Sequence, residues 1–355
     1  EVKGNLSLQN VRVWGDVATT SPSDKNGVAL FESWISYDFN TNWTAKFGRQ
    51  VLSYDNQRIM GGIDWLQQGQ SHDAVLVTNK KNNYQMDFGA ALNNNNEALY
   101  ESAYVTNYKN MQFIWFNQKF SKLSLSFLAL NNGYQYENLT ENKFQVAYLQ
   151  TIGTYGKWDT SKFYGDFGLY AQTGEAAVTN DKVDVDAYYA GFNLGYKFTN
   201  SFKAELGFEY LSGKDQNDTD TKVKSFTPLF GTNHGFNGLM DYFYVGNHKN
   251  SVGLQDVYTK FIYDKNKWQV TLSPHLFYSS ASVYNMTTLE EQDNYLGIEI
   301  DITGTYKLDK NFIISGGVSK MFGSNTMEIL KGGNNNNCNN WAWVMVSFNP
   351  QLFTY

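Results

Sequence analysis

Apolar and polar residues alternate with a period of two over long stretches of this sequence, and that pattern limits its fold more than any other feature. The clearest run covers residues 202–210 (FKAELGFEY), and shorter runs cover residues 123–127 and 295–302. Strict alternation over five or more residues is typical of a β-strand with one apolar face. Runs such as residues 183–198 and 311–323 are longer than the roughly 5–6 residues of most globular strands. The pattern therefore favours a barrel of long strands over a soluble β-sandwich, whose strands also alternate.

The connections between these runs alternate between short and long. Tight turns on one side and long loops on the other are the asymmetry of a bacterial outer-membrane barrel. We therefore predict an all-β fold in which residues 1–355 form a single antiparallel transmembrane β-barrel domain. It should have about 16 strands, with about 14 to 18 as the range, short periplasmic turns and long extracellular loops. The predicted turns are residues 39–42, 79–82, 118–122, 156–161, 199–201, 264–267 and 309–311, and the predicted loops are residues 15–28, 53–71, 93–110, 131–141, 174–182, 212–250, 279–293 and 324–340.

The composition agrees with a membrane barrel. Aromatic residues make up 17% of the chain and charged residues another 17%, against roughly 25% charged residues in an ordinary soluble domain. The mean hydropathy is nevertheless negative. A barrel explains this combination, because one face of each strand touches lipid, the other faces a polar lumen, and aromatic girdles lie at both interfaces. Aromatic residues such as Phe39, Trp43, Tyr263 and Trp268 flank the predicted short turns, where a periplasmic girdle would lie.

The sequence carries no strong catalytic signature. It lacks the nucleophile-elbow, zinc-protease, CxxC and Walker motifs, whose chemistry depends on fixed residue spacing. The four histidines (His72, His234, His248 and His275) have no metal-ligand spacing, and Cys338 is the single cysteine. The net charge of −6 does not suggest the basic patch of a nucleic-acid-binding protein. We therefore predict no enzymatic activity, no cofactor, no metal site and no nucleic-acid partner.

Three segments differ from the alternating background, and each lies where a strand runs into a long loop. They cover residues 48–73, 226–243 and 321–343, and each combines glycine, aromatic residues and charge. One interpretation is that they fold inward and stabilise the barrel through buried ion pairs and turns, and the other is that they narrow the lumen and contact the solute. We expect loops near residues 53–71, 212–250 and 324–340 to fold inward. The candidate residues of the solute path are Arg49, Arg58, Asp64, His72, Asp73, His234, Asp241, Lys320, Glu328 and Lys331.

These segments also carry a family resemblance. The motifs are GRQ at residues 48–50, RIMGG at residues 58–62, PLFGTNH at residues 228–234 with MDYF at residues 240–243, and MFGSNTME at residues 321–328. On these motifs the chain resembles the alginate-export porin family, specifically its Bacteroidota-type members, over nearly its whole length. The resemblance implies a single-chain barrel in the outer membrane of a Gram-negative bacterium, with a lumen gated by loops and lined with charge. For the alginate exporter itself, it implies a strongly electropositive constriction that conducts an anionic polysaccharide.

The arginine content departs from this family pattern. The chain has three arginines, Arg12, Arg49 and Arg58, whereas an anion-selective pore needs rings of Arg or Lys. Arg49 and Arg58 match the family motifs, with Lys320 and Lys331 as additions near the third segment. The barrel and the porin role therefore transfer better than alginate as the substrate. Replacing Arg49 and Arg58 with Gln is predicted to lower the anion current relative to the cation current.

The sequence thus predicts an outer-membrane porin or channel for small polar solutes or oligosaccharides, anionic ones included. The alternative is a structural or accessory barrel whose lumen is plugged and which belongs to a larger outer-membrane protein assembly. A third hypothesis is an outer-membrane enzyme. A sixteen-stranded barrel is wide enough to hold water, which favours transport. The expected partners are outer-membrane lipid and lipopolysaccharide, a polar solute or oligosaccharide, and other outer-membrane proteins.

Overall fold

The computed structural model describes residues 1–20, 27–63, 65–97, 99 and 103–353. In this part of the chain sixteen strands form one antiparallel sheet, and each strand pairs with its neighbours in sequence. A short helix, α1 (Asn325–Lys331), and a 3-10 turn, η1 (Val245–Asn247), lie in the connections. The strands are β1 (Val2–Gln9), β2 (Ala29–Asp38), β3 (Trp43–Gln50), β4 (His72–Lys81), β5 (Tyr84–Leu92), β6 (Asn110–Phe120), β7 (Leu123–Asn138), β8 (Lys143–Asp159), β9 (Phe163–Ala177), β10 (Lys182–Lys197), β11 (Phe202–Leu211), β12 (Leu254–Lys265), β13 (Trp268–Tyr278), β14 (Tyr295–Lys307), β15 (Phe312–Gly323) and β16 (Asn339–Phe348).

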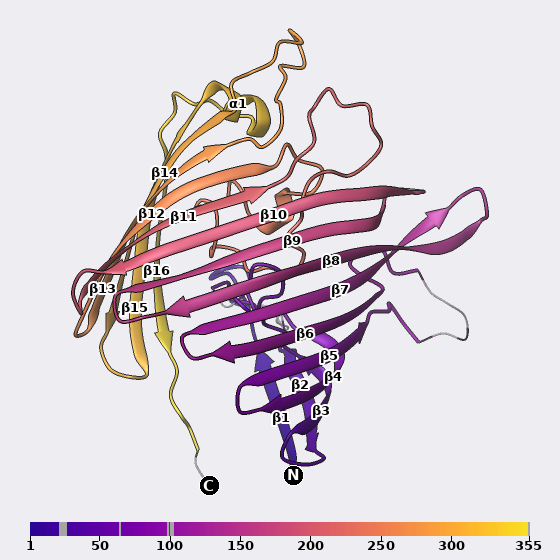
Figure 1. Ribbon diagram of the computed structural model, residues 1–355, viewed down its shortest axis with the longest axis vertical. Coiled ribbons are helices and arrows are strands. Elements are labelled where there is room, and N and C mark those ends of the chain that lie inside the picture. The colour runs from indigo at the N-terminus through magenta and orange to yellow at the C-terminus, as the bar shows by residue number, and fades with distance from the viewer. Residues whose placement is uncertain (21–26, 64, 98, 100–102, 354–355) are drawn as a thin grey trace.

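The sheet curves around an interior that the long loops enter (Figure 1). Seven tight connections lie at one end of the strands, which we call the short-turn end, and the other end is the long-loop end. The prediction of an all-β fold with about 16 strands is confirmed. Within the described residues no ladder joins β1 to β16, so these two are the edge strands. The tight connections are residues 39–42, 82–83, 121–122, 160–162, 198–201, 266–267 and 308–311, which confirms the seven predicted turns.

The two faces of the sheet differ as the alternation predicts. In β11, Leu206 and Phe208 are exposed whereas Glu209 is buried, and in β14 Ile302 is exposed whereas Asp301 is buried. The outer face is therefore apolar and the inner face carries polar and charged residues, which suits a sheet with lipid outside. Exposed aromatic residues lie beside the short turns, as a girdle requires, namely Phe39, Trp43, Phe120, Phe163, Phe198, Phe202, Tyr263 and Trp268.

Two connections that the sequence predicts as long loops are strands in the structure. Residues 139–142 alone connect β7 to β8, in place of residues 131–141, and residues 178–181 alone connect β9 to β10, in place of residues 174–182. These four strands are 15–17 residues long. Many of their residues near the long-loop end are polar, because the strands continue beyond the apolar band. Polar composition therefore does not mark the end of the ladder here.

Pro274 interrupts the ladder on one side of its strand, β13. The ladder between β12 and β13 pairs Tyr258 with His275 and Phe261 with Leu272, and no residues between these pairs are matched. Proline has no N–H to donate to a ladder. On the other side Pro274 is matched with Ile300 of β14, so the strand continues through the interruption.

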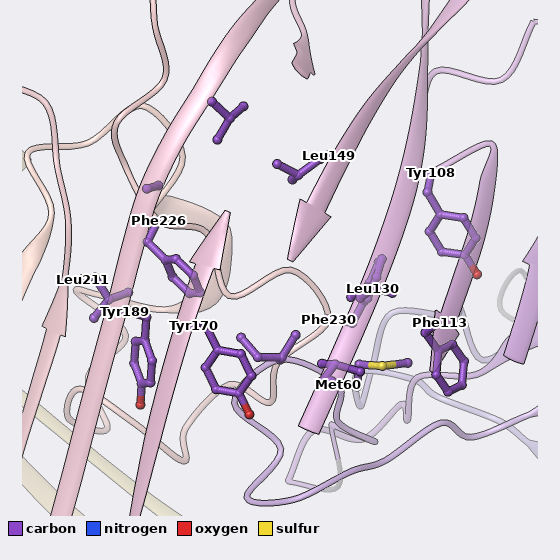
Figure 2. Packing of buried hydrophobic residues seen from close by; sticks show 14 of the residues in the cluster. Met60, Tyr108, Phe113, Leu130, Leu149, Tyr170, Tyr189, Leu211, Phe226 and Phe230 are labelled. Carbon is purple, nitrogen blue, oxygen red and sulfur yellow. The ribbon is translucent and has the colours of Figure 1, made fainter. Parts of the chain in front are cut away.

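Buried apolar residues from the long loops pack against the inner face. Met60 from the β3–β4 connection and Phe230 from the β11–β12 connection lie near Leu130 and Tyr170 of the sheet (Figure 2). All four belong to one cluster of buried hydrophobic residues. Loop residues therefore occupy part of the interior. No helix among the described residues is long and apolar enough to cross a membrane.

Candidate functional site

Two long loops meet inside the sheet and pair with each other. We call their paired segments, residues 57–62 and 228–232, the loop clasp. Met60 and Phe230 form a parallel β-bridge, and the Gly61 amide donates a hydrogen bond to the Phe230 carbonyl at 2.9 Å. The clasp therefore joins the RIMGG and PLFGTNH motifs, which lie far apart in the sequence.

Glycine at two motif positions allows this close approach. A Cβ atom at Gly231 would lie 2.3 Å from the Arg58 carbonyl oxygen, and one at Gly61 would lie 3.0 Å from the Thr232 nitrogen. The two loops also contain residues other than glycine with left-handed backbone, a conformation that costs about 1–3 kcal/mol and persists where the surrounding structure holds it. These residues are Asp55, Gln57, Ile63, Leu229, His234, Asn237, Asp241 and Asn250.

Arg58 fixes the clasp to the sheet wall. Its side chain is 1% exposed, and its Nη2 atom lies 3.0 Å from Glu209 Oε2 of β11. The same nitrogen donates to Asn237 Oδ1 at 2.8 Å, and Asn237 Nδ2 donates to Glu209 Oε2 at 2.8 Å. The guanidinium also lies 4.5 Å from the ring centroid of Phe236. One cation thus holds the first loop, the second loop and the wall together.

A histidine between two carboxylates continues this network along the wall. His275 Nδ1 of β13 lies 2.9 Å from Asp256 Oδ2 of β12, and its Nε2 atom lies 3.9 Å from Asp301 Oδ2 of β14. Asn237 Nδ2 donates to Asp256 Oδ2 at 3.3 Å, and Ser319 Oγ donates to Asp301. The network therefore runs from β11 to β15 across the inner face.

Glu299 of β14 anchors the second loop. Its Oε1 atom accepts hydrogen bonds from the backbone amides of Leu239 at 2.6 Å and Met240 at 2.8 Å. Gly238 beside them has a φ of +82°, and a Cβ atom there would lie 2.5 Å from Glu299 Oε1. Only glycine satisfies both the left-handed backbone and the close approach of the carboxylate.

Tyr54 and Asp55 anchor the first loop on the opposite wall. The Tyr54 hydroxyl donates to Asp87 Oδ2 at 3.0 Å. Asp55 Oδ1 accepts hydrogen bonds from Ser126 Oγ at 2.6 Å and from Trp115 Nε1 at 3.1 Å. Burial raises the pKa of Asp55 to about 6, against the hydrogen bonds from Ser126 and Trp115, which lower it.

A cavity of about 310 Å³ lies between the second loop and the wall. The wall contributes Glu205, Lys260 and Asp301, and the loop contributes His234 and Leu239. Glu205 and Lys260 lie nearer the short-turn end than Glu209 and Asp256 of the same strands. The cavity therefore opens below the Arg58 network, on the short-turn side of the loops.

Four of the predicted site residues lie around the clasp. Arg58 is at its centre, as described. The His72 Nδ1 atom is 2.7 Å from the Tyr108 hydroxyl, and the His72 ring packs edge-on against Phe230. His234 Nε2 lies 3.1 Å from Asp241 Oδ2. Burial raises the pKa of Asp241, although the charge of His234 opposes this effect.

Three predicted residues face away from the loops. Arg49 and Asp73 are opposite each other in the β3–β4 ladder, and Arg49 Nη1 lies 3.0 Å from Asp73 Oδ2. Their neighbours Gln50 and His72 are buried on the inner face, so the alternation of the strands puts this ion pair on the outer face. Lys320 likewise follows the buried Ser319, is exposed, and lies over the ring of Phe322. The expectation that these three contact a solute in the lumen does not fit these positions.

Of the three remaining predicted residues, Glu328 and Lys331 lie in α1. Glu328 Oε2 accepts a hydrogen bond from the Asn335 amide at 3.0 Å, closing the β15–β16 connection. Lys331 Nζ lies 5.0 Å from the ring centroid of Phe243, and burial lowers its pKa. Asp64 lies outside the described residues.

Sequence reasoning missed the carboxylates of the network. Glu209, Asp256, Glu299 and Asp301 are all buried on the inner face. Each of them is a charged residue on the polar face of an alternating strand. Charge on the polar faces of neighbouring strands was therefore the sequence signal that could have indicated this network. Among the described residues, no group of three or more His, Cys, Asp or Glu could hold a metal ion.

Comparison with known proteins agrees with the family motifs and with the fold. The family model described as alginate export matches residues 5–337, which confirms the resemblance drawn from the motifs. No curated protein matches the chain. The crystal structure of Pseudomonas aeruginosa OccK10 (OpdN) is similar with a TM-score of 0.59 and 11% identity, over 93% of this chain and 86% of that one. Acinetobacter baumannii OccAB1 is similar with a TM-score of 0.58 and 12% identity, over 90% of this chain and 77% of that one. At such identities the likeness concerns the fold.

Proposed function

This chain belongs to the alginate export family, and from that premise we propose that it passes small polar solutes, with neutral and cationic ones favoured over anions. The chain is an outer-membrane β-barrel channel of a Gram-negative bacterium and not an enzyme, as the sequence predicts. Its placement among the Bacteroidota-type members of the family stays a prediction. The solute preference follows from the charges around the loop clasp.

The charge of the inner face is the observation that carries this proposal. The carboxyl groups of Glu209, Asp256, Glu299 and Asp301 lie together on the wall, with Arg58 and His275 among them. Acidic groups thus outnumber basic groups where the loops approach the wall. Acidic side chains along a pore favour cations over anions. An anionic polysaccharide such as alginate therefore fits this wall poorly.

The loop clasp is the element that we propose sets the aperture. It is fixed to the wall on one side by Arg58 and on the other by Asp55. Charged anchors at both ends hold the loops at a constant position, so the opening beside them has a fixed size. A fixed opening of this kind selects small solutes by size, and the acidic wall then selects them by charge.

Ion selectivity in planar bilayers tests this proposal. With a KCl gradient across the membrane, the reversal potential should show a preference for K⁺. The preference should grow from pH 5 to pH 8, because carboxyl groups attract cations only after losing their protons. Glu205→Gln should weaken it, since Glu205 lines the cavity below the loops. Glu175→Gln is the matched control, because Glu175 borders an outer surface groove near the long-loop end. A reversal potential that shows a preference for Cl⁻ contradicts the proposal.

A second function is favoured by the packing of the clasp. Met60, Phe226 and Phe230 are buried in the hydrophobic cluster of the interior, and side chains that filled the whole interior would block ions. The barrel would then serve as an accessory element of an outer-membrane assembly. The bilayer measurement separates the two functions. Folded protein that carries no current at any voltage favours the accessory role.

Lipopolysaccharide is the membrane partner that we propose for the outer face. Lys320 is exposed there, three residues before the long-loop end of β15. A lysine on the lipid-facing side near this rim can reach the phosphate groups of lipopolysaccharide, because its long stem allows the charge to approach the interface. Binding to other outer-membrane proteins stays a prediction.

A further inference from the structure

We propose that a second cavity inside the sheet, at its long-loop end, is a binding site for a small monocarboxylate with an apolar body. The cavity is separate from the acidic wall, and its occupation does not depend on whether the channel conducts. It measures about 680 Å³, within the roughly 300–1,000 Å³ of small-molecule sites. We call it the upper cavity.

The walls of the upper cavity are mainly apolar. They come from β7 to β10 and from the β5–β6, β9–β10 and β11–β12 connections, and Leu149 on this wall is seen in Figure 2. A pocket with apolar walls and a few polar groups is the ordinary form of a site for a small organic ligand. An oligosaccharide presents hydroxyl groups on every side and would leave many of them unpaired here. The apolar lining includes Val105, Tyr134, Leu149, Ala176, Val185 and Val223.

The upper cavity is held open by hydrogen bonds between the second loop and the wall. Gln172 of β9 donates from Nε2 to the Thr227 carbonyl at 2.8 Å and accepts from the Thr227 amide at 3.0 Å. The Val223 amide donates to the Asp184 carbonyl at 2.9 Å, and the Asp186 amide donates to the Val223 carbonyl at 2.9 Å. A ligand therefore meets a preformed site and needs to order little of the protein, which favours binding.

Ser225 supplies a hydrogen-bonding group that lacks a partner. It lines the cavity, is 1% exposed, and its Oγ atom has no partner among the described residues. Buried polar groups are nearly always hydrogen-bonded. A hydroxyl left free in an apolar cavity is thus suited to bind a polar ligand atom.

Lys249 and Glu137 set the charge of the ligand. Both line the upper cavity, and no ion pair to either is found in the described part of the chain. One carboxylate on the ligand can pair with Lys249 and accept from the Ser225 hydroxyl. A second carboxylate would be repelled by Glu137. The ligand class is therefore a monocarboxylate rather than an oligouronate.

Calorimetric titration of the full chain in lipid nanodiscs tests the proposal, with empty nanodiscs as the blank. The probe is 4-phenylbutyrate, compared with butyrate, which lacks the apolar body, and with 4-phenylbutanamide, which lacks the charge. We expect 4-phenylbutyrate to bind at least about tenfold more tightly than either comparison compound, because both the ring and the charge contribute. Equal affinities for all three compounds overturn the proposal.

Matched variants locate the site. Ala176→Phe fills the cavity and should abolish binding, whereas Ala171→Phe, on the outer face of the same strand, should not. Lys249→Gln should remove the preference for 4-phenylbutyrate over its amide, whereas Lys222→Gln should leave it, because Lys222 does not line the cavity. Ser225→Ala should weaken the binding of 4-phenylbutyrate by about fivefold, which is the effect of losing one hydrogen bond. Unchanged binding by Ala176→Phe, in a protein with the wild-type strand content, places the ligand elsewhere and overturns the proposal.

Discussion

Arg58 and Arg49 lie nine positions apart in one segment of the sequence, residues 48–73, and have opposite surroundings. The Arg58 side chain is 1% exposed and its partner Glu209 is 4% exposed, whereas Arg49 and Asp73 are 36% and 59% exposed. The N–O distance is 3.0 Å in both pairs. The inner pair joins two loops to the wall, and the outer pair joins two adjacent strands that the ladder already holds. Geometry alone therefore says little about the role of an ion pair, and its position decides what is lost when it breaks.

The largest expected effect is that of breaking the inner pair. Arg58→Gln leaves Glu209 as a buried charge without its cation, which costs about 3–5 kcal/mol of unfolding free energy. The loops should also lose their anchor, so the single-channel current should become larger or noisier. Urea titration in lipid vesicles and bilayer recording measure the two effects. If the variant has wild-type stability and current, the inner ion pair contributes no more to stability or loop position than the outer one.

Asp55 is a buried carboxyl group like Glu209, but it accepts hydrogen bonds from the neutral side chains of Ser126 and Trp115 rather than pairing with an arginine. Its folded pKa of about 6 lies above the ordinary value of 3.8. The folded state therefore holds this proton more tightly than the unfolded state, and the free energy of unfolding falls as the pH rises from about 4 to about 6. The contribution is on the order of 3 kcal/mol at most.

The measurement is the urea midpoint of wild type and Asp55→Asn at pH 4.5 and pH 7.5. The variant should lose less stability than wild type between these two pH values, because the amide does not titrate. Equal losses in the two proteins would mean that Asp55 has an ordinary pKa.

Gly231→Ala tests the clasp without changing any charge. The added Cβ would meet the Arg58 carbonyl oxygen at 2.3 Å, so the two loops must separate. Forced repacking of this kind costs about 1–3 kcal/mol. The same substitution at Gly304, where a Cβ meets nothing within 4 Å, is the matched control. If both variants have the wild-type urea midpoint, the loops are not held together as described.

The smallest effect is expected for the outer pair. Arg49→Gln should change the unfolding free energy by about 0–1 kcal/mol, the usual worth of an exposed ion pair. It should also leave the ratio of cation to anion current unchanged, because Arg49 faces away from the lumen. A change in ion selectivity similar to that of Arg58→Gln would mean that Arg49 lies on the solute path. The sequence prediction that the two arginines act together would then hold.

The sequence was sufficient for the fold because alternation and turn chemistry are local. It also held more information about orientation than the motifs suggested. Arg49 has the same strand phase as Phe47, and Lys320 has the same phase as Val318, so their outward positions follow from the period of two. The motif residues were instead grouped by charge, which placed them on the solute path.

The partners of Arg58 could not be predicted in this way. Glu209 is 151 positions from Arg58, and Asn237 is 179 positions away. Nothing in the local pattern of either segment indicates the other, because the contact depends on how far two loops reach across the sheet. The buried network and the upper cavity therefore required the structure, although the inward phase of Glu209 and Asp301 was visible in their strands.

The pairing of the clasp also has a consequence for the order of assembly. Gln70 of the first loop bonds to Phe230 of the second, 160 positions away, and eight strands lie between the two loops in the chain. Contacts between distant segments form only after the intervening chain has been organised, because closing so large a loop costs entropy before any contact repays it. We therefore expect the clasp to close late, after β4 to β11 have paired. On this expectation, the wall of a nascent barrel is built before its interior is obstructed.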